Sequence, residues 1–389
     1  MRLPSAWSGP STALVAALAL AGPVALAPLA GASDSSTVGG PDLAHHGVVS
    51  HGRPPVVYAK AWVVADATTG EVLAAKSAHQ RMRPASTLKT LTAVTLLPLL
   101  DKQQTYRAQY EDAAVEGSAV GIVPGGTYTV DQLFYGLMLP SGNDAAHALA
   151  SAAGGMRRTV TLMSKQATHL QAYDTTVRNP SGLDADEEYS SAYDLALFAR
   201  AGLQRDDFRR YVTTTSYAFP GRMPRNGGKR DTFMIYNQNP LLTDYRGAMG
   251  VKTGFTTLAG RTFVGAARRQ GHLLIVALMG VVEPSEDAAA RLLTWGFANV
   301  GDVAPVGVLV DPLPQGGLHP SATSTPTPTS VPAAAGLAPT SSGPGGVWAL
   351  GAAVALLAFF VVLLSMLAGR RSRRPRSNGM ERVPFQFRG

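Results

Sequence analysis

The stretch Arg83-Pro84-Ala85-Ser86-Thr87-Leu88-Lys89-Thr90 gives the strongest indication of fold and chemistry in this sequence. It predicts the start of a helix, with Pro84 just ahead and Ser86 as a capping or first-turn residue. Positions three apart share a face of a helix, so the Ser86 hydroxyl would lie beside the Lys89 amine. A neutral lysine can take the proton of a serine and make it a nucleophile. Alone, the pair is more simply explained by a capping serine and a solvent-facing lysine.

A second string, Pro140-Ser141-Gly142-Asn143-Asp144, places Ser141 55 residues after Ser86 and directly before a predicted helix. Its simplest explanation is a turn followed by a helix cap, which this composition suits. A chemical explanation makes the Ser141 hydroxyl a proton relay and lets the Asn143 amide orient a substrate or Lys89. Both explanations stay open from this string alone.

The third string, Lys252-Thr253-Gly254, begins 111 residues after Ser141 and lies in a β-type run. A lysine in a buried run is unusual, because an unpaired buried charge is costly. Gly254 would let another backbone or a ligand approach closely. Lys252 could instead stand on an edge strand and discourage aggregation. Side chains alternate along a strand, so Lys252 and Thr253 serve one site only near a strand edge or a local twist.

Together, the strings Ser-x-x-Lys, Ser-Gly-Asn and Lys-Thr-Gly stand in the order typical of penicillin-binding proteins and class A β-lactamases. The chain resembles the D-alanyl-D-alanine carboxypeptidases of peptidase family S11, the low-molecular-weight penicillin-binding proteins. The resemblance covers roughly residues 59–300 and includes four further strings: Asn179-Pro180-Ser181-Gly182-Leu183-Asp184, Tyr189-Ser190-Ser191-Ala192-Tyr193-Asp194-Leu195, Asn237-Gln238-Asn239-Pro240-Leu241-Leu242 and Leu292-Leu293-Thr294-Trp295-Gly296-Phe297. It implies an α+β fold of the serine DD-peptidase/β-lactamase type, with an antiparallel sheet, flanking helices and a helical subdomain.

The resemblance also implies a role for each residue of the three strings. Ser86 is expected to attack the peptide bond between two terminal D-alanines and form an acyl-enzyme, with Lys89 as proton acceptor. Ser141 is expected to relay the proton to the leaving amine, and Asn143 to hold Lys89 and the substrate. Water then hydrolyses the ester, β-lactams acylate Ser86 as slow mimics, and no metal or cofactor is expected. The substrate carboxylate and oxyanion would contact a further set: Lys252, Thr253, Gly254 and the backbone N–H groups of Ser86 and Phe255.

The order of predicted elements agrees with this fold class. Two β-type runs, 56–64 and 71–75, flank a turn at 66–70 and predict a hairpin. Helices are predicted at 86–100, 144–153, 190–201 and 283–298, and three consecutive strands at 249–255, 261–268 and 272–280. Strands therefore bracket a helical middle, which predicts an antiparallel sheet with an inserted helical region.

The two ends of the chain predict export and membrane attachment. Residues 1–32 are typical of a signal peptide that is cleaved after Ala32. Residues 347–368 are 22 uncharged, mostly apolar residues, enough for a transmembrane helix of roughly 33 Å. Arginines follow at once, so the tail at 369–389 is expected in the cytoplasm and the body outside the cell membrane.

Two connecting segments define the limits of the predicted catalytic domain at 55–311. A flexible segment is predicted at 33–54, where Gly, Ser and His are common. A Pro-, Ser- and Thr-rich linker is predicted at 312–346, because such composition cannot bury a core. Its eight prolines favour extended conformations, with a reach of roughly 100 Å.

Composition excludes several other classes of protein. The chain has no cysteine, which rules out disulfides, Cys-ligated zinc, iron–sulfur clusters and a cysteine nucleophile. The net charge of +8 belongs largely to the seven arginines of the tail, so the body is close to neutral. We therefore expect no nucleic-acid partner. The expected partners are peptidoglycan stem peptides ending in D-Ala-D-Ala, β-lactam antibiotics and the membrane.

Three other functions share these residues or this fold. A DD-endopeptidase or transpeptidase acting on cross-linked peptidoglycan uses identical motifs. A β-lactamase would need a base for the deacylating water, and no Glu-x-x-Leu-Asn string lies between Ser141 and Lys252. A non-catalytic sensor of muropeptides or β-lactams is disfavoured by three intact motifs and a tail too short for a signalling domain.

Overall fold

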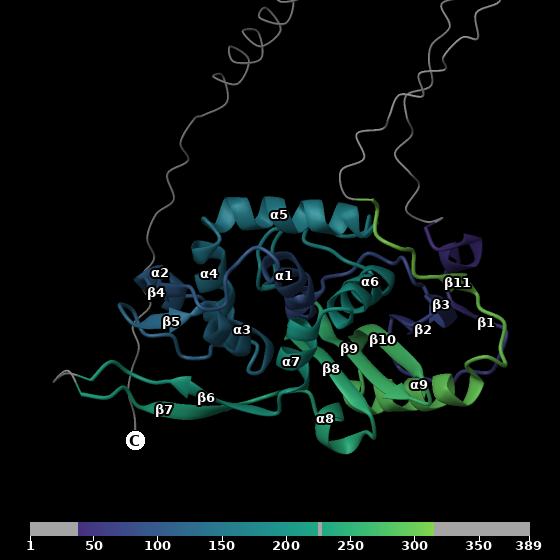
Figure 1. Cartoon of the computed structure of the whole chain (residues 1–389). Helices are drawn as coiled ribbons and strands as arrows, with labels where there is room; N and C mark the ends of the chain where they lie inside the picture. The colour runs from purple at the N-terminus through teal and green to yellow at the C-terminus, as the bar shows by residue number, and fades with distance from the viewer. Residues whose placement is uncertain (1–37, 225–227, 315–389) are drawn as a thin grey trace, which may run out of the picture. The chain divides into compact units, whose positions relative to one another are not determined.

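A seven-stranded antiparallel sheet lies in one half of the structure, a computed structural model that describes residues 38–224 and 228–314 (Figure 1). The strands follow the order β1-β3-β2-β10-β9-β8, and β11 also pairs with β3. The predicted antiparallel sheet is therefore confirmed. The strand bounds are β1 Val48–Ser50, β2 Ala61–Asp66, β3 Glu71–Lys76, β8 Ala248–Thr256, β9 Gly260–Arg269, β10 His272–Val281 and β11 Gly307–Val308.

A helical region is inserted between β3 and β8, as the order of predicted elements indicates. It also carries two small antiparallel sheets, β4 Thr105–Arg107 with β5 Thr127–Thr129 and β6 Ser216–Pro220 with β7 Thr232–Tyr236. The 3-10 helices are η2 Pro41–Ala44 and η3 Ala85–Leu88. The α-helices are α1 Lys89–Leu96, α2 Tyr110–Ala113, α3 Val130–Met138, α4 Asn143–Ala152, α5 Met156–His169, α6 Ala192–Leu203, α7 Asp206–Thr213, α8 Leu241–Asp244 and α9 Ser285–Asn299.

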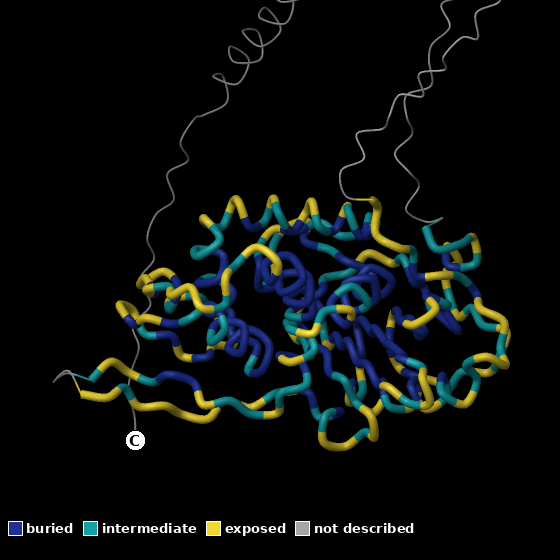
Figure 2. The backbone as a smooth tube through the Cα atoms, viewed as in Figure 1, coloured by how far each residue is buried: buried dark blue, intermediate teal, exposed yellow. Residues whose placement is uncertain are grey.

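Both faces of the large sheet are buried. Alternate residues of β2 belong to two different apolar clusters, with Val63 in one and Trp62 in the other. Helix α9 packs on β9 and β10 from one side, and α6 packs on β2 and β10 from the other. Figure 2 shows the central strands of the sheet, α1 and α3 as buried. Because successive side chains of a strand point to opposite faces, this layering explains why the central strands β2 and β10 are apolar at nearly every position.

The hairpin predicted around residues 66–70 forms between β2 and β3. The Asp66 carboxylate accepts the Thr68 N–H at 2.8 Å, and Gly70 takes a φ of 89°, which favours glycine. The first strand begins at Ala61 rather than at the predicted residue 56. Val56 and Tyr58 ahead of it are 76% and 63% exposed, so apolar character alone overestimates this strand.

The helix predicted at 86–100 is divided into η3 and the shorter α1. The backbone enters η3 through Ala85 at a φ of 49°. Pro98 has no N–H to donate, so the regular helix ends before it. The other predicted helices and the three consecutive strands match α4, α6, α9, β8, β9 and β10 closely.

The prediction of a flexible segment at 33–54 is wrong from residue 38 onward. Strand β1 pairs with β3, with Val48 opposite Lys76. Leu43 in η2 is 1% exposed and belongs to the main apolar cluster. The physical reason is that β3 would otherwise present an open edge, which a short strand and one apolar anchor can cover.

Several sequence predictions fall outside the described residues. These are the signal peptide at 1–32, nearly all of the linker at 312–346, the transmembrane helix at 347–368 and the tail at 369–389. Across 38–224 and 228–314, every helix is too short or too polar to cross a membrane.

Candidate active site

Ser86 and Lys89 lie at the junction of η3 and α1, one turn apart. Lys89 Nζ lies 2.8 Å from Ser86 Oγ. Ser86 is partly exposed and lines a cavity of about 270 Å³, whereas the Lys89 side chain is completely buried. The structure therefore places the two side chains side by side, as their spacing predicts.

Lys89 Nζ contacts three uncharged oxygen atoms and forms no ion pair with any described residue. Besides Ser86, the acceptors are Asn143 Oδ1 and the Ser181 carbonyl oxygen, each at 2.7 Å. Burial, and then the nearby Lys252 ammonium, holds the pKa of Lys89 well below its usual value. A neutral amine has two hydrogens, which it can donate to Asn143 and Ser181 while its lone pair faces Ser86. Lys89 is thus arranged to accept the hydroxyl proton.

Asn143, the first residue of α4, is oriented by a loop that crosses over it. Its Nδ2 donates to the Glu116 carbonyl oxygen at 2.6 Å. Gly117 passes so close that a Cβ there would lie 2.8 Å from Asn143 Nδ2, and its φ is 86°. The Asp144 carboxylate then accepts three backbone N–H groups of the same loop, those of Val120, Gly121 and Ile122. Sequence reasoning missed this role of Asp144, which holds the loop against α4.

Ser141 lies in the wall of the same cavity, with its backbone in the left-handed region at a φ of 65°. The residue is 3% exposed, and its Oγ has no hydrogen-bond partner among the described residues. A buried hydroxyl without a partner is costly. Ser141 thus lies at the cavity, but its Oγ forms no hydrogen bond with Ser86 or Lys89.

Lys252 lies on β8, the strand at one end of the large sheet, and is 1% exposed. Its Nζ donates to the carbonyl oxygen of Thr253 at 2.8 Å, and burial lowers the pKa of Lys252 to about 7. Thr253 and Gly254 line the cavity, but Lys252 does not. Of the predicted carboxylate contacts, Thr253 and Gly254 thus line the cavity, whereas Lys252 is buried next to them.

Gly254 allows β8 to run directly against η3. A Cβ at this position would lie 3.0 Å from the Ser86 nitrogen and 2.4 Å from Thr262 Oγ1. Thr262 in turn donates to the Pro84 carbonyl oxygen at 2.8 Å, which ties β9 to the start of η3. The close approach places the Ser86 N–H next to β8, where the predicted second oxyanion donor, Phe255, also lines the cavity.

Four residues of the cavity wall are absent from the sequence prediction: Ser118, Gln238, Arg261 and Ser285. Arg261 stands opposite Phe255 in the β8–β9 ladder and forms no ion pair within the described ranges. It therefore offers the cavity a positive charge. Gln238 belongs to the 237–242 string of the family resemblance, whereas Ser118 and Arg261 carry no signal of their own in the sequence.

Comparison with known sequences adds an independent observation. The sequence model of a family described as D-alanyl-D-alanine carboxypeptidase matches residues 49–283, a range that contains all three strings. A Mycobacterium tuberculosis protein named D-alanyl-D-alanine carboxypeptidase DacB2 is 41% identical over 258 residues. That alignment covers 64% of this chain and 86% of the relative.

Solved structures agree with the sequence comparison. A crystal structure of a D-alanyl-D-alanine carboxypeptidase from Mycobacterium tuberculosis matches with a TM-score of 0.63 and 39% identity, over 68% of this chain and 99% of that one. The Streptomyces K15 DD-transpeptidase matches with a TM-score of 0.60 and 30% identity, over 64% of this chain and 100% of that one. Both relatives are similar to this chain over nearly their whole length.

Proposed function

The chain belongs to the D-alanyl-D-alanine carboxypeptidase family, and we propose that it removes the terminal D-alanine from peptidoglycan stem peptides through an acyl-enzyme on Ser86. Its relatives support a serine peptidase activity, and a structural relative described as a penicillin-binding protein homologue supports acylation by β-lactams. One observation carries the assignment of residues: the fully buried Lys89 amine lies 2.8 Å from the partly exposed Ser86 hydroxyl.

The proposed reaction has two halves. In the first, Ser86 Oγ attacks the carbonyl carbon of the penultimate D-alanine while Lys89 Nζ takes the hydroxyl proton. The C–N bond then breaks, the leaving amine receives a proton through Ser141, and an ester remains on Ser86. In the second, water attacks the ester with Lys89 as base, which releases the shortened peptide and restores the serine. Asn143 holds Lys89 in place throughout.

The oxyanion and the free carboxylate of the substrate would bind along β8. The backbone N–H groups of Ser86 and Phe255 are proposed to stabilise the oxyanion, since both residues line the cavity. The carboxylate is proposed to contact the Thr253 side chain, with Arg261 nearby in the same wall. Lys252, buried beside this subsite and bonded to the Thr253 carbonyl oxygen, is proposed to attract the carboxylate by its positive charge.

Labelling with a fluorescent penicillin tests the nucleophile. The wild-type chain should form a covalent adduct on Ser86, and Ser86→Ala should form none while its thermal unfolding is unchanged. Ser141→Ala serves as a second variant, which keeps the nucleophile and should be labelled slowly. An adduct that persists in folded Ser86→Ala would exclude Ser86 as the acylated residue.

We also propose that the catalytic domain lies on the outer side of the cell membrane. Its support is sequence alone: the signal peptide pattern at 1–32, the apolar run at 347–368 and the arginines after it. Protease added to intact cells should digest the catalytic domain, and alkaline extraction should leave the full chain in the membrane. A chain that washes off at high pH would contradict the transmembrane helix.

Transfer to an amine is a second candidate outcome of the same acyl-enzyme. The observation in its favour is the 30% identity to a structure named as a DD-transpeptidase. Adding a D-amino acid acceptor to the assay measures the ratio of transfer to hydrolysis. A ratio that stays low at saturating acceptor supports the carboxypeptidase, and predominant transfer would favour the transpeptidase.

A further inference from the structure

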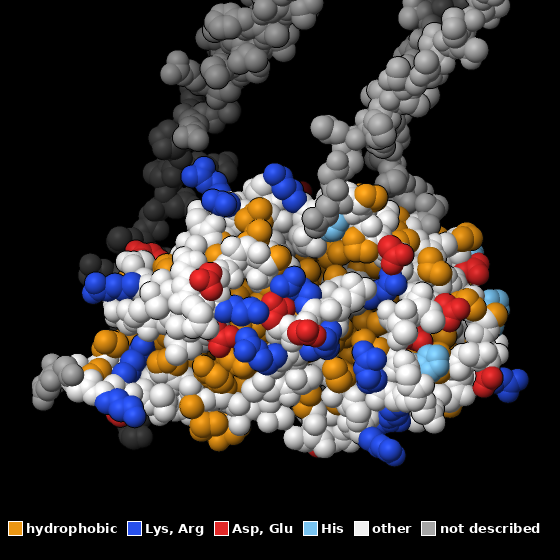
Figure 3. Space-filling model, viewed as in Figure 1, with side chains coloured by type: hydrophobic (Ala, Val, Ile, Leu, Met, Phe, Trp, Pro, Cys, Tyr) orange, Lys and Arg blue, Asp and Glu red, His pale blue; other side chains and the backbone are white. Residues whose placement is uncertain are grey.

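The outer face of α5 carries positive charge without negative charge. Arg157, Arg158 and Lys165 are exposed on it, and α5 contains no aspartate or glutamate. None of the three cations forms an ion pair within the part of the chain that the structure describes. The other exposed positions of the helix are uncharged: Thr161, Ser164 and Thr168. Figure 3 shows Lys and Arg side chains projecting from the edge that α5 forms.

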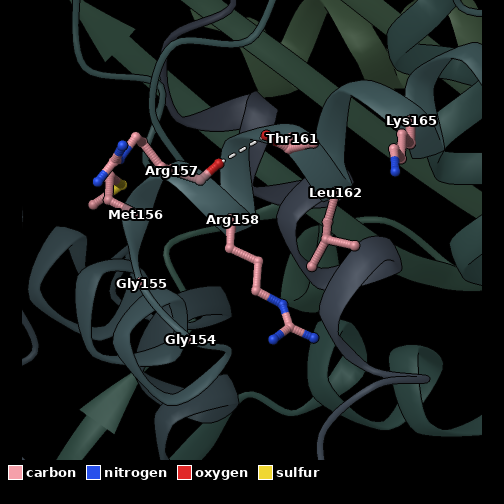
Figure 4. Close-up of a pocket in the computed structure, with 8 residues that line it drawn as sticks. All are labelled: Gly154, Gly155, Met156, Arg157, Arg158, Thr161, Leu162 and Lys165. Atoms are coloured by element: carbon pink, nitrogen blue, oxygen red, sulfur yellow. Dashed lines mark hydrogen bonds between the residues drawn. The ribbon is translucent and has the colours of Figure 1, made fainter.

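A hollow of about 700 Å³ lies beside the first turns of α5 and is lined by the same three cations. Figure 4 shows Arg158 and Leu162 extending to the same side of the helix, with Lys165 further along it. Met156 and Leu162 contribute half-buried apolar surface to this wall. Lys and Arg side chains close to a membrane surface are attracted to its anionic lipids.

The inner face of α5 is already occupied, so only the outer face is available to a partner. Thr159, Met163 and Ala167 are buried on the inner face. The Thr92 hydroxyl of α1 lies 3.7 Å from the sulfur of Met163. Figure 1 shows α1 between α5 and the sheet, so contact through α5 would leave β8 free.

The described chain ends beside α5. Leu313 N–H donates to the His169 carbonyl oxygen at the end of this helix at 2.8 Å, and Gln171 Nε2 donates to the Asp311 carbonyl oxygen at 2.9 Å. The linker predicted at 312–346 therefore starts at one end of the basic face. A chain attached to a membrane through this linker would hold α5 at high effective concentration near the lipid.

We propose that the outer face of α5 docks on the anionic phospholipid surface of the membrane that holds the chain. The charge is complementary, and the linker leaves the domain at this helix. The proposal rests on the membrane attachment proposed above. Each cation near an anionic surface strengthens binding roughly fivefold, so the three together shift the docked population roughly a hundredfold.

The absence of cysteine allows a direct test with the full chain. A single Thr161→Cys on α5 is labelled with an environment-sensitive fluorophore, and Thr243→Cys on α8 is the control position. The chain is reconstituted in vesicles of phosphatidylcholine, with or without one third phosphatidylglycerol. Emission at position 161 should shift to the blue only with phosphatidylglycerol, and emission at position 243 should not change.

A matched pair of charge variants assigns the effect to α5. Changing Arg157, Arg158 and Lys165 to Gln should abolish the blue shift. Changing three exposed arginines on other surfaces to Gln should preserve it: Arg107, Arg246 and Arg268. No response to phosphatidylglycerol, or equal responses of the two triple variants, would overturn the proposal.

Flotation in high salt measures separately whether the chain stays attached to the vesicles. A chain that floats but gives no lipid-dependent emission refutes docking and retains the anchor. A chain that leaves the vesicles in high salt, but whose position 161 responds to phosphatidylglycerol in low salt, refutes the anchor and retains docking.

A separate network of hydrogen bonds lies behind Lys89. The Ser181 carbonyl oxygen that accepts from Lys89 belongs to a turn held by Asn179 Oδ1. Asn179 Oδ1 accepts the Ser181 N–H at 3.0 Å, the Ser181 hydroxyl at 2.7 Å and the Gly182 N–H at 2.8 Å. Gly182 packs so tightly on η3 that a Cβ there would lie 1.9 Å from the Ala85 carbonyl oxygen.

Glu188 holds this turn from inside the protein. It is 1% exposed, and its Oε1 accepts the backbone N–H groups of Arg178 and Asn179, both at 3.0 Å, and the Asn179 side chain at 3.1 Å. The charged groups that act on it are Arg83 and, across the turn, the Lys89 amine. Burial raises the pKa of Glu188 to about 7.

We infer that Glu188 is a positioning residue for Lys89, acting through Asn179 and Ser181 and through its own charge. Glu188→Gln keeps an oxygen to accept the backbone N–H groups but removes the negative charge. Loss of that charge favours the neutral amine, so the rising limb of the pH profile of penicillin acylation should move to lower pH by about half a unit.

Glu187→Gln is the matched control, since Glu187 is an exposed neighbour that pairs with Arg178. Its pH profile should equal that of the wild type. An unchanged profile in a Glu188→Gln chain that folds normally would overturn the inference, because a purely structural role would alter stability but leave the pH profile in place.

Discussion

Two buried lysines in the cleft, that is, the cavity and the residues packed around it, have different partners from three buried carboxylates elsewhere in the domain. Outside the cleft, three buried carboxylates each lie against a histidine ring: Asp66 with His272 at 2.6 Å, Asp112 with His147 at 2.7 Å and Asp174 with His79 at 2.7 Å. In the cleft, Lys89 and Lys252 are just as buried but contact only uncharged oxygens. Hydrogen bonds hold the pKa of Asp112 in the first group below its usual value, whereas burial lowers the pKa of both lysines and so favours their neutral form.

We propose that the difference separates groups that stabilise the fold from groups that take part in the reaction. A buried ammonium without a counter-charge is costly, and the cost is relieved when the amine loses its proton. The lowered pKa of Lys89 increases the share of the neutral amine, the form that can accept a proton. The same burial makes Lys252 sensitive to an arriving negative charge, which the carboxylate of the substrate supplies.

Replacing Lys89 should have the largest effect and separates catalysis from stability. In Lys89→Met the rate of acylation by penicillin should fall about 10²–10⁴-fold, because the general base is lost. The free energy of unfolding should fall by no more than about 1 kcal/mol, since a buried amine without a counter-charge is removed. Stopped-flow acylation and urea unfolding measure the two quantities. A loss of about 3–5 kcal/mol, as for a broken buried ion pair, would contradict the comparison.

Replacing Lys252 should affect substrates according to their C-terminus. Lys252→Ala should lower kcat/KM about 10–100-fold for a peptide with a free carboxylate, because the buried positive charge next to Thr253 no longer attracts that carboxylate. The same peptide with an amidated C-terminus, already a poor substrate, should lose much less. Equal losses for the two peptides would remove Lys252 from carboxylate recognition.

The pH profile should distinguish the two lysines. Activity rises with pH as Lys89 loses its proton, and for a carboxylate substrate it falls above about pH 7 as Lys252 loses its charge. Each limb should change kcat/KM about tenfold per pH unit. With the amidated peptide the falling limb should disappear. If kcat/KM rises steadily to pH 10 for both substrates, neither lysine has a lowered pKa.

Asp112→Asn should have the smallest effect on activity and tests the other side of the comparison. Burial alone would raise the pKa of Asp112, but hydrogen bonds from His147 and Tyr106 hold it below its usual value. The substitution should cost about 1–3 kcal/mol of unfolding free energy at neutral pH and leave acylation unchanged.

The sign of the pH dependence follows from the lowered pKa of Asp112. Its stabilising effect is complete above the unfolded pKa of about 4 and is lost as pH falls further. The difference between wild type and Asp112→Asn should therefore shrink below that pH in calorimetry. A slower acylation in Asp112→Asn would show that this cluster takes part in catalysis.

Contacts and turns that depend on residues close in sequence could be predicted from the sequence. Ser86 and Lys89 are one turn apart in any helical conformation, and Asn143 follows a turn before a helix, so their contacts could be anticipated from the sequence. The hairpin around Gly70 and the three strands of 248–281 follow from periodicity and turn residues in the same way.

Contacts that depend on the tertiary fold could not be predicted in this way. The Ser181 carbonyl oxygen, the third acceptor of Lys89, is a backbone group placed by Asn179 and Glu188. Arg261 enters the cavity wall only because β9 pairs with β8. Strand β1 forms because it pairs with the edge of β3. The sequence of residues 48–50 alone does not indicate this pairing.

The measurement closest to the central claim is release of D-alanine from an N-acylated Lys-D-Ala-D-Ala peptide by the full chain in detergent. We expect release by the wild type and none by Ser86→Ala, with both proteins folded. The wild type should also lose the activity after treatment with penicillin. Release that survives in Ser86→Ala, or a wild type that binds penicillin on Ser86 but releases no D-alanine, would contradict the central claim.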